Sequence, residues 1–159
     1  MLKSMFSAFL MYSRIPVPPV EWKPENRRFA LCFFPMIGGI IGIFYVIWWQ
    51  IGIKSGLNEL LRGAGATILP VLVTGGIHLD GFCDVSDTKA SYGDTKKRLE
   101  IMKDSHVGAF AVIDLIIYFL LQTALFSQVQ ALHTSVIIAI GYVLSRTLSG
   151  LTAVTFRTA

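Results

Sequence analysis

Residues 29–53 read FALCFFPMIGGIIGIFYVIWWQIGI and contain no charged side chain. An α-helix needs about 20 predominantly apolar residues to cross the hydrocarbon core of a bilayer, so this stretch is long enough to do so. Gly38, Gly39 and Gly42 within it would let a second helix approach closely. Trp48 and Trp49, near its end, suit the membrane interface. The stretch therefore predicts a membrane-spanning helix with a closely packed neighbour.

The composition of the whole chain agrees with a membrane protein. Of its 159 residues, 53% are hydrophobic and only 15% are charged, and the mean hydropathy is +0.61. These values are too apolar for an ordinary soluble domain. The net charge of +4 does not require a nucleic-acid partner, and we expect none, because the basic residues cluster beside the expected spans. We predict one all-α domain over residues 1–159, embedded in the lipid bilayer, and the sequence leaves its oligomeric state open.

Three further apolar stretches complete a predicted polytopic helical bundle with about four transmembrane helices. Residues 63–77 are short for a span, and they become adequate if the helix begins near Leu57 or continues into the acidic segment that follows. Residues 107–127 and 131–156 are long enough. An amphipathic helix at the membrane interface is expected at the amino terminus. Apolar residues recur there at helical spacing: Leu2, Met5, Phe6, Phe9 and Leu10.

The lysine and arginine residues predict which ends of the spans face the cytoplasm, because cytoplasmic loops carry an excess of both. Five of them precede the first span and five follow the second, whereas two lie between these spans. In chain order they are Lys3, Arg14, Lys23, Arg27 and Arg28; then Lys54 and Arg62; then Lys89, Lys96, Lys97, Arg98 and Lys103. We therefore expect a bacterial or archaeal inner-membrane protein whose amino terminus and polar segment 78–106 face the cytoplasm. Cys32 and Cys83 are expected to be reduced thiols.

Residues 78–87, HLDGFCDVSD, carry the strongest candidate site. On a helix with about 100° per residue, Asp84 lies about 40° around the axis from Asp80 in one direction. Asp87 lies about 20° from Asp80 in the other direction, so all three share one face. Two carboxylates about 6 Å apart repel by roughly 3 kcal/mol at an effective dielectric near 20, so such a face takes up protons or holds a cation. Oxygen ligands beside a membrane favour magnesium and phosphate chemistry. The alternative is a solvated acidic helix face, which the apolar residues between the carboxylates argue against.

A second polar group follows in residues 100–108, EIMKDSHVG. Glu100 and Asp104 would lie one helical turn apart and could complete an oxygen shell. Lys103 and His106 could hold phosphate oxygens or transfer a proton. The alternative is the end of an ordinary amphipathic helix with an exposed salt bridge.

Two ionisable residues fall inside predicted spans, where charges are expensive and often functional. Asp114 and Arg146 could pair with each other, or Arg146 could bind a substrate phosphate. His78 lies on the opposite side of the acidic helix from Asp80, so we expect a hydrogen-bonded structural role for it rather than a metal contact.

Glycines and a polar break divide the central part of the chain. Gly75 and Gly76 could bend the second span or admit a ligand near the backbone, although close packing is the commoner reason for such glycines. Gly81 could give a phosphate room beside the helix backbone. A break at residues 91–94 is expected to separate two helices, with Asp94 as the N-cap of the second.

Several motifs occur in a recognisable order. They are SRIPVP at residues 13–18, FPMIG at 34–38, TGGIHLDGFCDVSD at 74–87, RLEIMKDSHVG at 98–108, and Ser145-Arg146. In sequence and order, across nearly the whole chain, they resemble the cobalamin synthase (adenosylcobinamide-GDP ribazoletransferase) family.

The resemblance implies a magnesium-dependent transfer in the last assembly stage of coenzyme B12. Adenosylcobinamide-GDP and alpha-ribazole (or its 5′-phosphate) give adenosylcobalamin (or its phosphate) and GMP, because a ribose hydroxyl attacks the phosphorus attached to the cobinamide arm. The metal ligands implied by the resemblance are Asp80, Asp84 and Asp87, with Asp104 as a further one. The implied phosphate contacts or proton-handling groups are Lys103, His106 and Arg146.

The chain departs from the family in two respects. After Asp87 the family commonly continues with glycine or a small residue, whereas this chain has Thr88-Lys89. Family members are also longer, so we expect a form truncated at the carboxyl end with little activity alone. One alternative is another membrane alcohol phosphotransferase with CDP-linked donors, whose signature has an Ala-Arg pair where this chain has Phe82-Cys83. The other is a non-catalytic membrane fragment that binds divalent cations.

Overall fold

The computed structural model describes residues 1–91, 94–104 and 106–156, and every regular element within those ranges is a helix, as predicted. In chain order these are α1 (Leu2–Tyr12), α2 (Pro24–Arg27), the short 3₁₀-helix η1 (Ala30–Phe33), α3 (Phe34–Lys54), α4 (Glu59–Thr74), α5 (Ile77–Ala90), α6 (Thr95–Ile101), α7 (Ala109–Ser127) and α8 (Leu132–Thr155). The expected N-cap of α6 is confirmed, because the Asp94 side chain accepts the backbone N–H of Lys97. Tyr92 and Gly93, in the predicted break before it, lie outside the described residues.

The chain is a multi-pass membrane protein. Three helical segments are each long and apolar enough to cross a bilayer: Pro24–Lys54, Ala109–Ser127 and Leu132–Thr155. The prediction of a second span over residues 63–77 is corrected, since α4 starts at Glu59, after the Asn58 N-cap, and ends at Thr74. α4 and α5 meet the criteria for a span only as a pair, and the pair is bent by 98°. The structure therefore has three straight candidate spans, or four if the bent pair counts as one.

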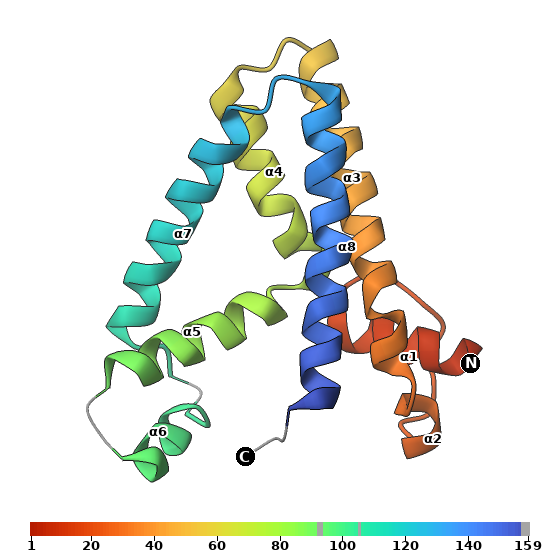
Figure 1. Ribbon diagram of the computed structural model, residues 1–159, viewed down its shortest axis with the longest axis vertical. Coiled ribbons are helices and arrows are strands. Elements are labelled where there is room, and N and C mark those ends of the chain that lie inside the picture. The colour runs from red at the N-terminus through yellow and green to blue at the C-terminus, as the bar shows by residue number, and fades with distance from the viewer. Residues whose placement is uncertain (92–93, 105, 157–159) are drawn as a thin grey trace.

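The long helices form two packed pairs that meet at one end. α3 lies beside α8 and α4 lies beside α7, and the pairs diverge from the end where α3 connects to α4 and α7 connects to α8 (Figure 1). At that end the Gln130 amide donates to Glu59 Oε1 at 2.8 Å, which joins the two connections. The amino terminus, α5, α6 and the carboxyl end of α8 lie at the opposite end of the molecule (Figure 1). This places the two polar segments that precede α3 and follow α4 on the same side.

Glycines set the distance between the paired helices. A Cβ at Gly38 would lie 2.5 Å from the carbonyl oxygen of Tyr142, and one at Gly42 would lie 2.7 Å from that of Ala139. These contacts confirm that α3 has a closely packed neighbour, which is α8. Gly63 has the same role in α4, because its Cβ would lie 2.5 Å from the carbonyl oxygen of Thr123 on α7.

The amino-terminal helix is confirmed, and its apolar residues are divided between the core and the surface. Phe9 is buried in the core cluster with Phe34, Ile37 and Ile41. Leu2 and Leu10, expected on the apolar face, are 63% and 44% exposed. The remaining buried positions of α1 are small residues that allow close approach to α3 and η1: Ser4, Ser7 and Ala8. Both cysteines are free thiols, as predicted.

Candidate functional site

Helix α5 carries the acidic motif across the base of the bundle (Figure 1). Two consecutive glycines make the turn from α4, since Gly75 and Gly76 have φ angles of 70° and 84°, in a region that side chains rarely adopt. A Cβ at Gly75 would also lie 2.8 Å from Nε of Arg14. The bend that these glycines allowed is therefore present, and it turns α5 out of the line of the second span.

The three aspartates of the motif share one side of α5, as their spacing predicted. Asp80 is exposed and Asp84 is half-buried. Within the described part of the chain, neither carboxylate takes part in a hydrogen bond or an ion pair. Both are thus free to accept a cation.

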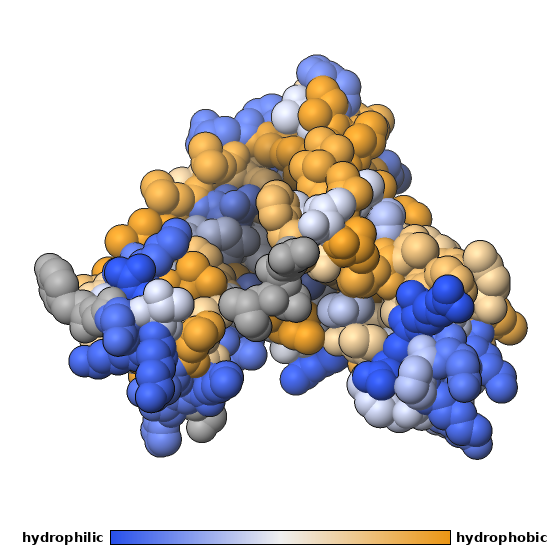
Figure 2. Space-filling model, turned by 60° about the horizontal axis from the view of Figure 1, so that its bottom comes forward, coloured by the Kyte–Doolittle hydropathy of each residue, from blue (hydrophilic) through white to orange (hydrophobic). Residues whose placement is uncertain are grey.

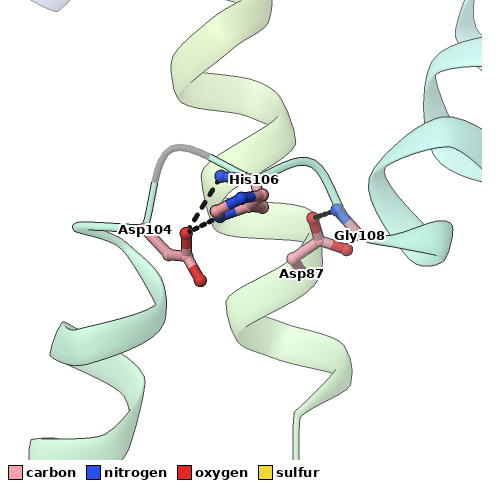
Figure 3. A network of polar contacts seen from close by, with 4 residues as sticks. All are labelled: Asp87, Asp104, His106 and Gly108. Carbon is pink, nitrogen blue, oxygen red and sulfur yellow. Dashed lines mark hydrogen bonds and ion pairs between the residues drawn. The ribbon is translucent and has the colours of Figure 1, made fainter.

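Asp87 has a different environment, because it caps helix α7. Its Oδ2 accepts the backbone N–H of Gly108 at 2.7 Å (Figure 3). Its Oδ1 accepts that of Ala111 at 3.0 Å. The first N–H groups of a helix have no partner within the helix, and a carboxylate there also interacts favourably with the helix dipole. A Cβ at Gly108 would lie 2.5 Å from Asp87 Oδ1, so the glycine allows this contact. Asp87 therefore fixes where α7 begins relative to α5.

Asp104 and His106 form a pair in the connection between α6 and α7. Asp104 Oδ1 accepts the backbone N–H of His106 at 3.0 Å and lies 2.6 Å from its ring Nδ1 (Figure 3). The ring contact, with the backbone bond, lowers the pKa of Asp104, and it raises the pKa of His106. The expected one-turn helical relation between Glu100 and Asp104 is wrong, because α6 ends at Ile101. The Asp104–His106 contact is exposed, as is Lys103, and it is an ion pair only when the His106 ring is protonated.

The carboxylates do not form a closed metal cage. Among the residues that the structure describes, no group of three or more His, Cys, Asp or Glu is placed to share one ion. Magnesium is commonly held by one or two carboxylates, several waters and substrate phosphates, and the free pair Asp80 and Asp84 fits that mode. Each oxygen of Asp87 keeps a further lone pair, so its predicted metal contact stays a prediction, as does that of Asp104.

Arg146 lies on α8 without a carboxylate partner. Its Nε is buried and has no hydrogen-bond partner, and its Nη1 reaches only Ser145 Oγ, at 3.4 Å. The predicted alternative of an ion pair with Asp114 is wrong, because Asp114 is exposed on α7 and the ion pairs found among the described residues do not include it.

His78 does not have the hydrogen-bonded role that we expected. Its ring packs on Phe34 with the centroids 5.6 Å apart, and its Nε2 is buried without a hydrogen-bond partner. Since it lies across α5 from Asp80, it borders the space between the helices, where it lines the same two cavities as Arg146.

Two adjoining cavities share His78, Ser145 and Arg146 in their walls. The larger, of about 490 Å³, lies between α4, α5, α7 and α8 and has mainly apolar walls. The smaller, of about 370 Å³, extends to Gly81 on α5 and Ser149 on α8. Viewed from the base, hydrophilic residues gather on the lobes formed by α6 and by α2, and the surface is hollowed between them (Figure 2).

The sequence analysis missed the polar residues of the larger cavity, which include Tyr118 and Gln122 of α7 and Tyr142 of α8. The spacing of these residues in the sequence could have identified them as one polar face of each helix. Tyr118 and Gln122 are four residues apart in a largely apolar helix, and Tyr142 and Arg146 repeat that interval in the next one. Residues four apart share a helix face, so each span presents a polar stripe to the interior.

Comparison with known proteins gives a consistent result. Residues 4–159 match the model of the family described as cobalamin-5-phosphate synthase. A protein of Lachnoclostridium phytofermentans named adenosylcobinamide-GDP ribazoletransferase is 49% identical over 158 residues, which cover 99% of this chain and 60% of that protein. Proteins with the same name from Clostridium botulinum and a Geobacillus species are 35% and 36% identical, over 77% and 72% of this chain and 48% and 46% of their own lengths.

No solved structure matches the chain. The chain spans between about half and about 60% of the length of these relatives. The family match nevertheless covers nearly all of its residues, including the whole of α5 and both cavities. This chain belongs to the cobalamin-5-phosphate synthase family.

Proposed function

We propose that the chain belongs to a magnesium-dependent transferase that joins adenosylcobinamide-GDP to alpha-ribazole, or to its 5′-phosphate, and releases GMP. The observation that carries the proposal is the family match over residues 4–159, on a chain whose acidic helix has two free carboxylates. The names of the relatives support the same donor and the same ribazole acceptor. The alternative of a CDP-linked alcohol phosphotransferase has no such support.

Asp80 and Asp84 would hold the magnesium ion in this proposal. When bound there, magnesium would offset the negative charge of the substrate diphosphate and of the departing GMP. Asp87 would act mainly by positioning α7 against α5, since both of its oxygens already accept backbone N–H groups.

The reaction forms one bond and breaks one. The ribose hydroxyl oxygen bonds to the phosphorus that bears the cobinamide arm, the bond from that phosphorus to the oxygen of GMP breaks, and the hydroxyl proton must leave. His106 is our candidate to take this proton. Its Nδ1 is in contact with Asp104, so its Nε2 would be the ring nitrogen that accepts the proton. Lys103 would contact oxygens of the diphosphate and reduce their charge, and Arg146 would contact a substrate phosphate.

The proposed active site faces the cytoplasm of a bacterial or archaeal inner membrane. The support is the charge distribution, since the basic residues that precede α3 and follow α4 are at the end of the molecule that holds α5 and α6 (Figure 1). Nucleotide substrates and magnesium are available on that side.

The test is release of GMP from adenosylcobinamide-GDP and alpha-ribazole in the presence of magnesium. Two proteins are compared in lipid nanodiscs: this chain, and this chain extended with the carboxyl-terminal segment of the Lachnoclostridium relative. We expect transfer by the extended protein and little by the chain alone, because further helices would help enclose a large corrinoid and exclude water. If the extended protein binds magnesium but releases no GMP, the chain is a cation-binding fragment and the proposed transfer is wrong.

A further inference from the structure

The buried Nε of Arg146 has a hydrogen-bonding requirement that the described residues of this chain do not meet. Its buried Nε has no hydrogen-bond partner, and no Asp or Glu within the described ranges forms an ion pair with it. A buried charge is strongly disfavoured unless it is paired and hydrogen-bonded. A guanidinium presents its donors in a planar fork that matches phosphate oxygens. The environment therefore favours an anion at Arg146.

His78 adds a second unsatisfied group on a different helix. Its Nε2 is also buried without a partner, and it shares with Arg146 and Ser145 the wall between the two cavities. Polar side chains from α5 and α8 thus border the same two cavities. Two unsatisfied buried groups beside the same empty volume indicate a polar ligand there.

The larger cavity would accommodate the rest of such a ligand. Its volume of about 490 Å³ is within the usual range of about 300–1,000 Å³ for small-molecule sites. Aromatic rings form much of its wall, including those of Phe82 and Tyr118, whose centroids are 6.0 Å apart, and that of Tyr142. Such walls favour a flat aromatic ring, which would stack on or pack edgewise against them.

Gly81 connects this position with the acidic face of α5. It lines the smaller cavity with Arg146, and no atom lies within 4 Å of a Cβ built there. Its φ is not positive, so neither backbone strain nor packing requires a glycine. Asp84 follows three residues later, about 60° around the helix. The absence of a side chain at Gly81 leaves open space beside the smaller cavity, on the helix that carries the carboxylates.

We propose that the two cavities form one binding site for an aromatic nucleoside phosphate, with the phosphate at Arg146 and His78 and the ring in the larger cavity. Resting on the proposed function, this assigns the site to the ribazole acceptor in its 5′-phosphate form. The phosphate group would be held on the side of α5 that leads past Gly81 to Asp80 and Asp84.

The test measures ligand binding by the full chain in phosphatidylcholine nanodiscs, by isothermal titration calorimetry. The probes are alpha-ribazole 5′-phosphate, alpha-ribazole and inorganic phosphate. We expect the phosphorylated nucleoside to bind at least about tenfold more tightly than the nucleoside, since a hydrogen bond to a charged group contributes about 1.5–3 kcal/mol. Inorganic phosphate should compete with the phosphorylated nucleoside only, a result that needs no variant to fold. Equal affinities for the two nucleosides would overturn the proposal.

Variants then locate the phosphate. R146Q should remove the preference for the phosphorylated nucleoside and leave the affinity for alpha-ribazole within about threefold, whereas the exposed R28Q is the matched control and should keep the preference. G81L should reduce the preference without lowering the unfolding temperature, because leucine is a better helix former than glycine. An unchanged preference in folded R146Q would overturn the assignment.

Two further measurements separate this inference from its alternatives. A lipid headgroup offers the same phosphate chemistry, so binding is repeated with phosphatidylglycerol in the nanodiscs. An unchanged affinity for the nucleoside phosphate supports a soluble ligand, and loss of that affinity overturns the assignment to substrate.

D84N should keep the phosphate preference and lose magnesium binding. If the extended protein releases GMP and no phosphate preference exists, only this inference is wrong; if the preference exists without GMP release, only the proposed function is wrong.

Discussion

Asp84 and Asp87 lie three residues apart on α5 and have different surroundings. Asp87 accepts two backbone N–H groups at the start of α7, whereas the carboxylate of Asp84 makes no contact of this kind with the described residues. Replacing Asp87 removes contacts that the folded protein already makes. Replacing Asp84 removes a negative charge that makes no hydrogen bond or ion pair with the described residues of the metal-free protein.

The first prediction follows for D84N. Because the side chain keeps its size and loses its charge, apo stability should be unchanged or higher, as repulsion from Asp80 falls. Loss of an outer-shell group commonly weakens metal binding by about 10–100-fold, so loss of a direct ligand should weaken magnesium binding by at least about tenfold. The measurement is the magnesium-dependent shift of the unfolding temperature in nanodiscs. D94N is the matched control, because asparagine also caps a helix well, and an equal magnesium shift in D84N and wild type would contradict the proposed site.

The second prediction concerns pH and the contact between Asp104 and His106. The raised pKa of His106 means that its stabilising contribution is complete below the ordinary value of 6.5 and is lost as the pH rises through the raised value. The lowered pKa of Asp104 means that its contribution is present above the ordinary value of 3.8 and is lost as the pH falls through the lowered value. The paired state thus occupies the window between the two shifted values.

Nuclear magnetic resonance titration of the His106 ring checks this prediction. The midpoint should lie above the ordinary histidine value of 6.5, and D104N should bring it down. A midpoint that does not respond to D104N would show that the pair does not form in solution.

At the scale of elements, α5 and α7 are joined by one side chain. The Asp87 carboxylate takes the place of a local N-cap, and Gly108 leaves the space for it. The third prediction is that D87A lowers the free energy of unfolding by about 1–2 kcal/mol in magnesium-free buffer, the usual range for loss of a strong cap. Hydrogen exchange should quicken first at the amides of Gly108 and Ala111. If D87A changes only magnesium-dependent stability, Asp87 is a metal ligand and its capping role is minor.

Several elements could be predicted from local chemistry, and others could not. The apolar runs predicted α3, α7 and α8 to within a few residues, and Asp94 predicted the start of α6. Gly75 and Gly76 allowed both a bend and close packing, because a glycine pair permits positive φ without requiring it. The 98° turn depends on what α5 packs against, which is α7 at a distance of more than 20 residues along the chain.

The candidate site shows the same division between local and long-range information. Helical spacing predicted that Asp80, Asp84 and Asp87 share a face, and this is so. That Asp87 caps another helix depends on how α5 packs against α7. That Arg146 borders the same cavities as His78, and does not pair with Asp114, depends on where the bundle places α8. Each of these residues had more than one chemically reasonable partner, and only the packing of the bundle selects among them.

At the scale of the whole molecule, charge is divided between its two ends. The end with the amino terminus, α5 and α6 holds ten of the lysine and arginine residues, whereas Lys54 and Arg62 lie toward the other end. Arg62 is buried and donates to Gln130, so among the described residues only Lys54 exposes a lysine or arginine cation there. An excess of basic residues marks cytoplasmic segments, and the structure places all of the excess on one side.

The last prediction is the orientation that follows from this division. Single cysteines are introduced by S55C, Q128C and K97C in a background that lacks Cys32 and Cys83, since all three positions are exposed. A membrane-impermeant maleimide applied to intact spheroplasts should label positions 55 and 128, and it should label position 97 only after the membrane is opened. Positions 55 and 128 must behave alike, because the bond between Gln130 and Glu59 joins their connections. Labelling of position 97 alone in intact cells would invert the orientation and separate the acidic helix from cytoplasmic nucleotides, whereas labelling of 55 and 97 together would contradict the arrangement of the spans.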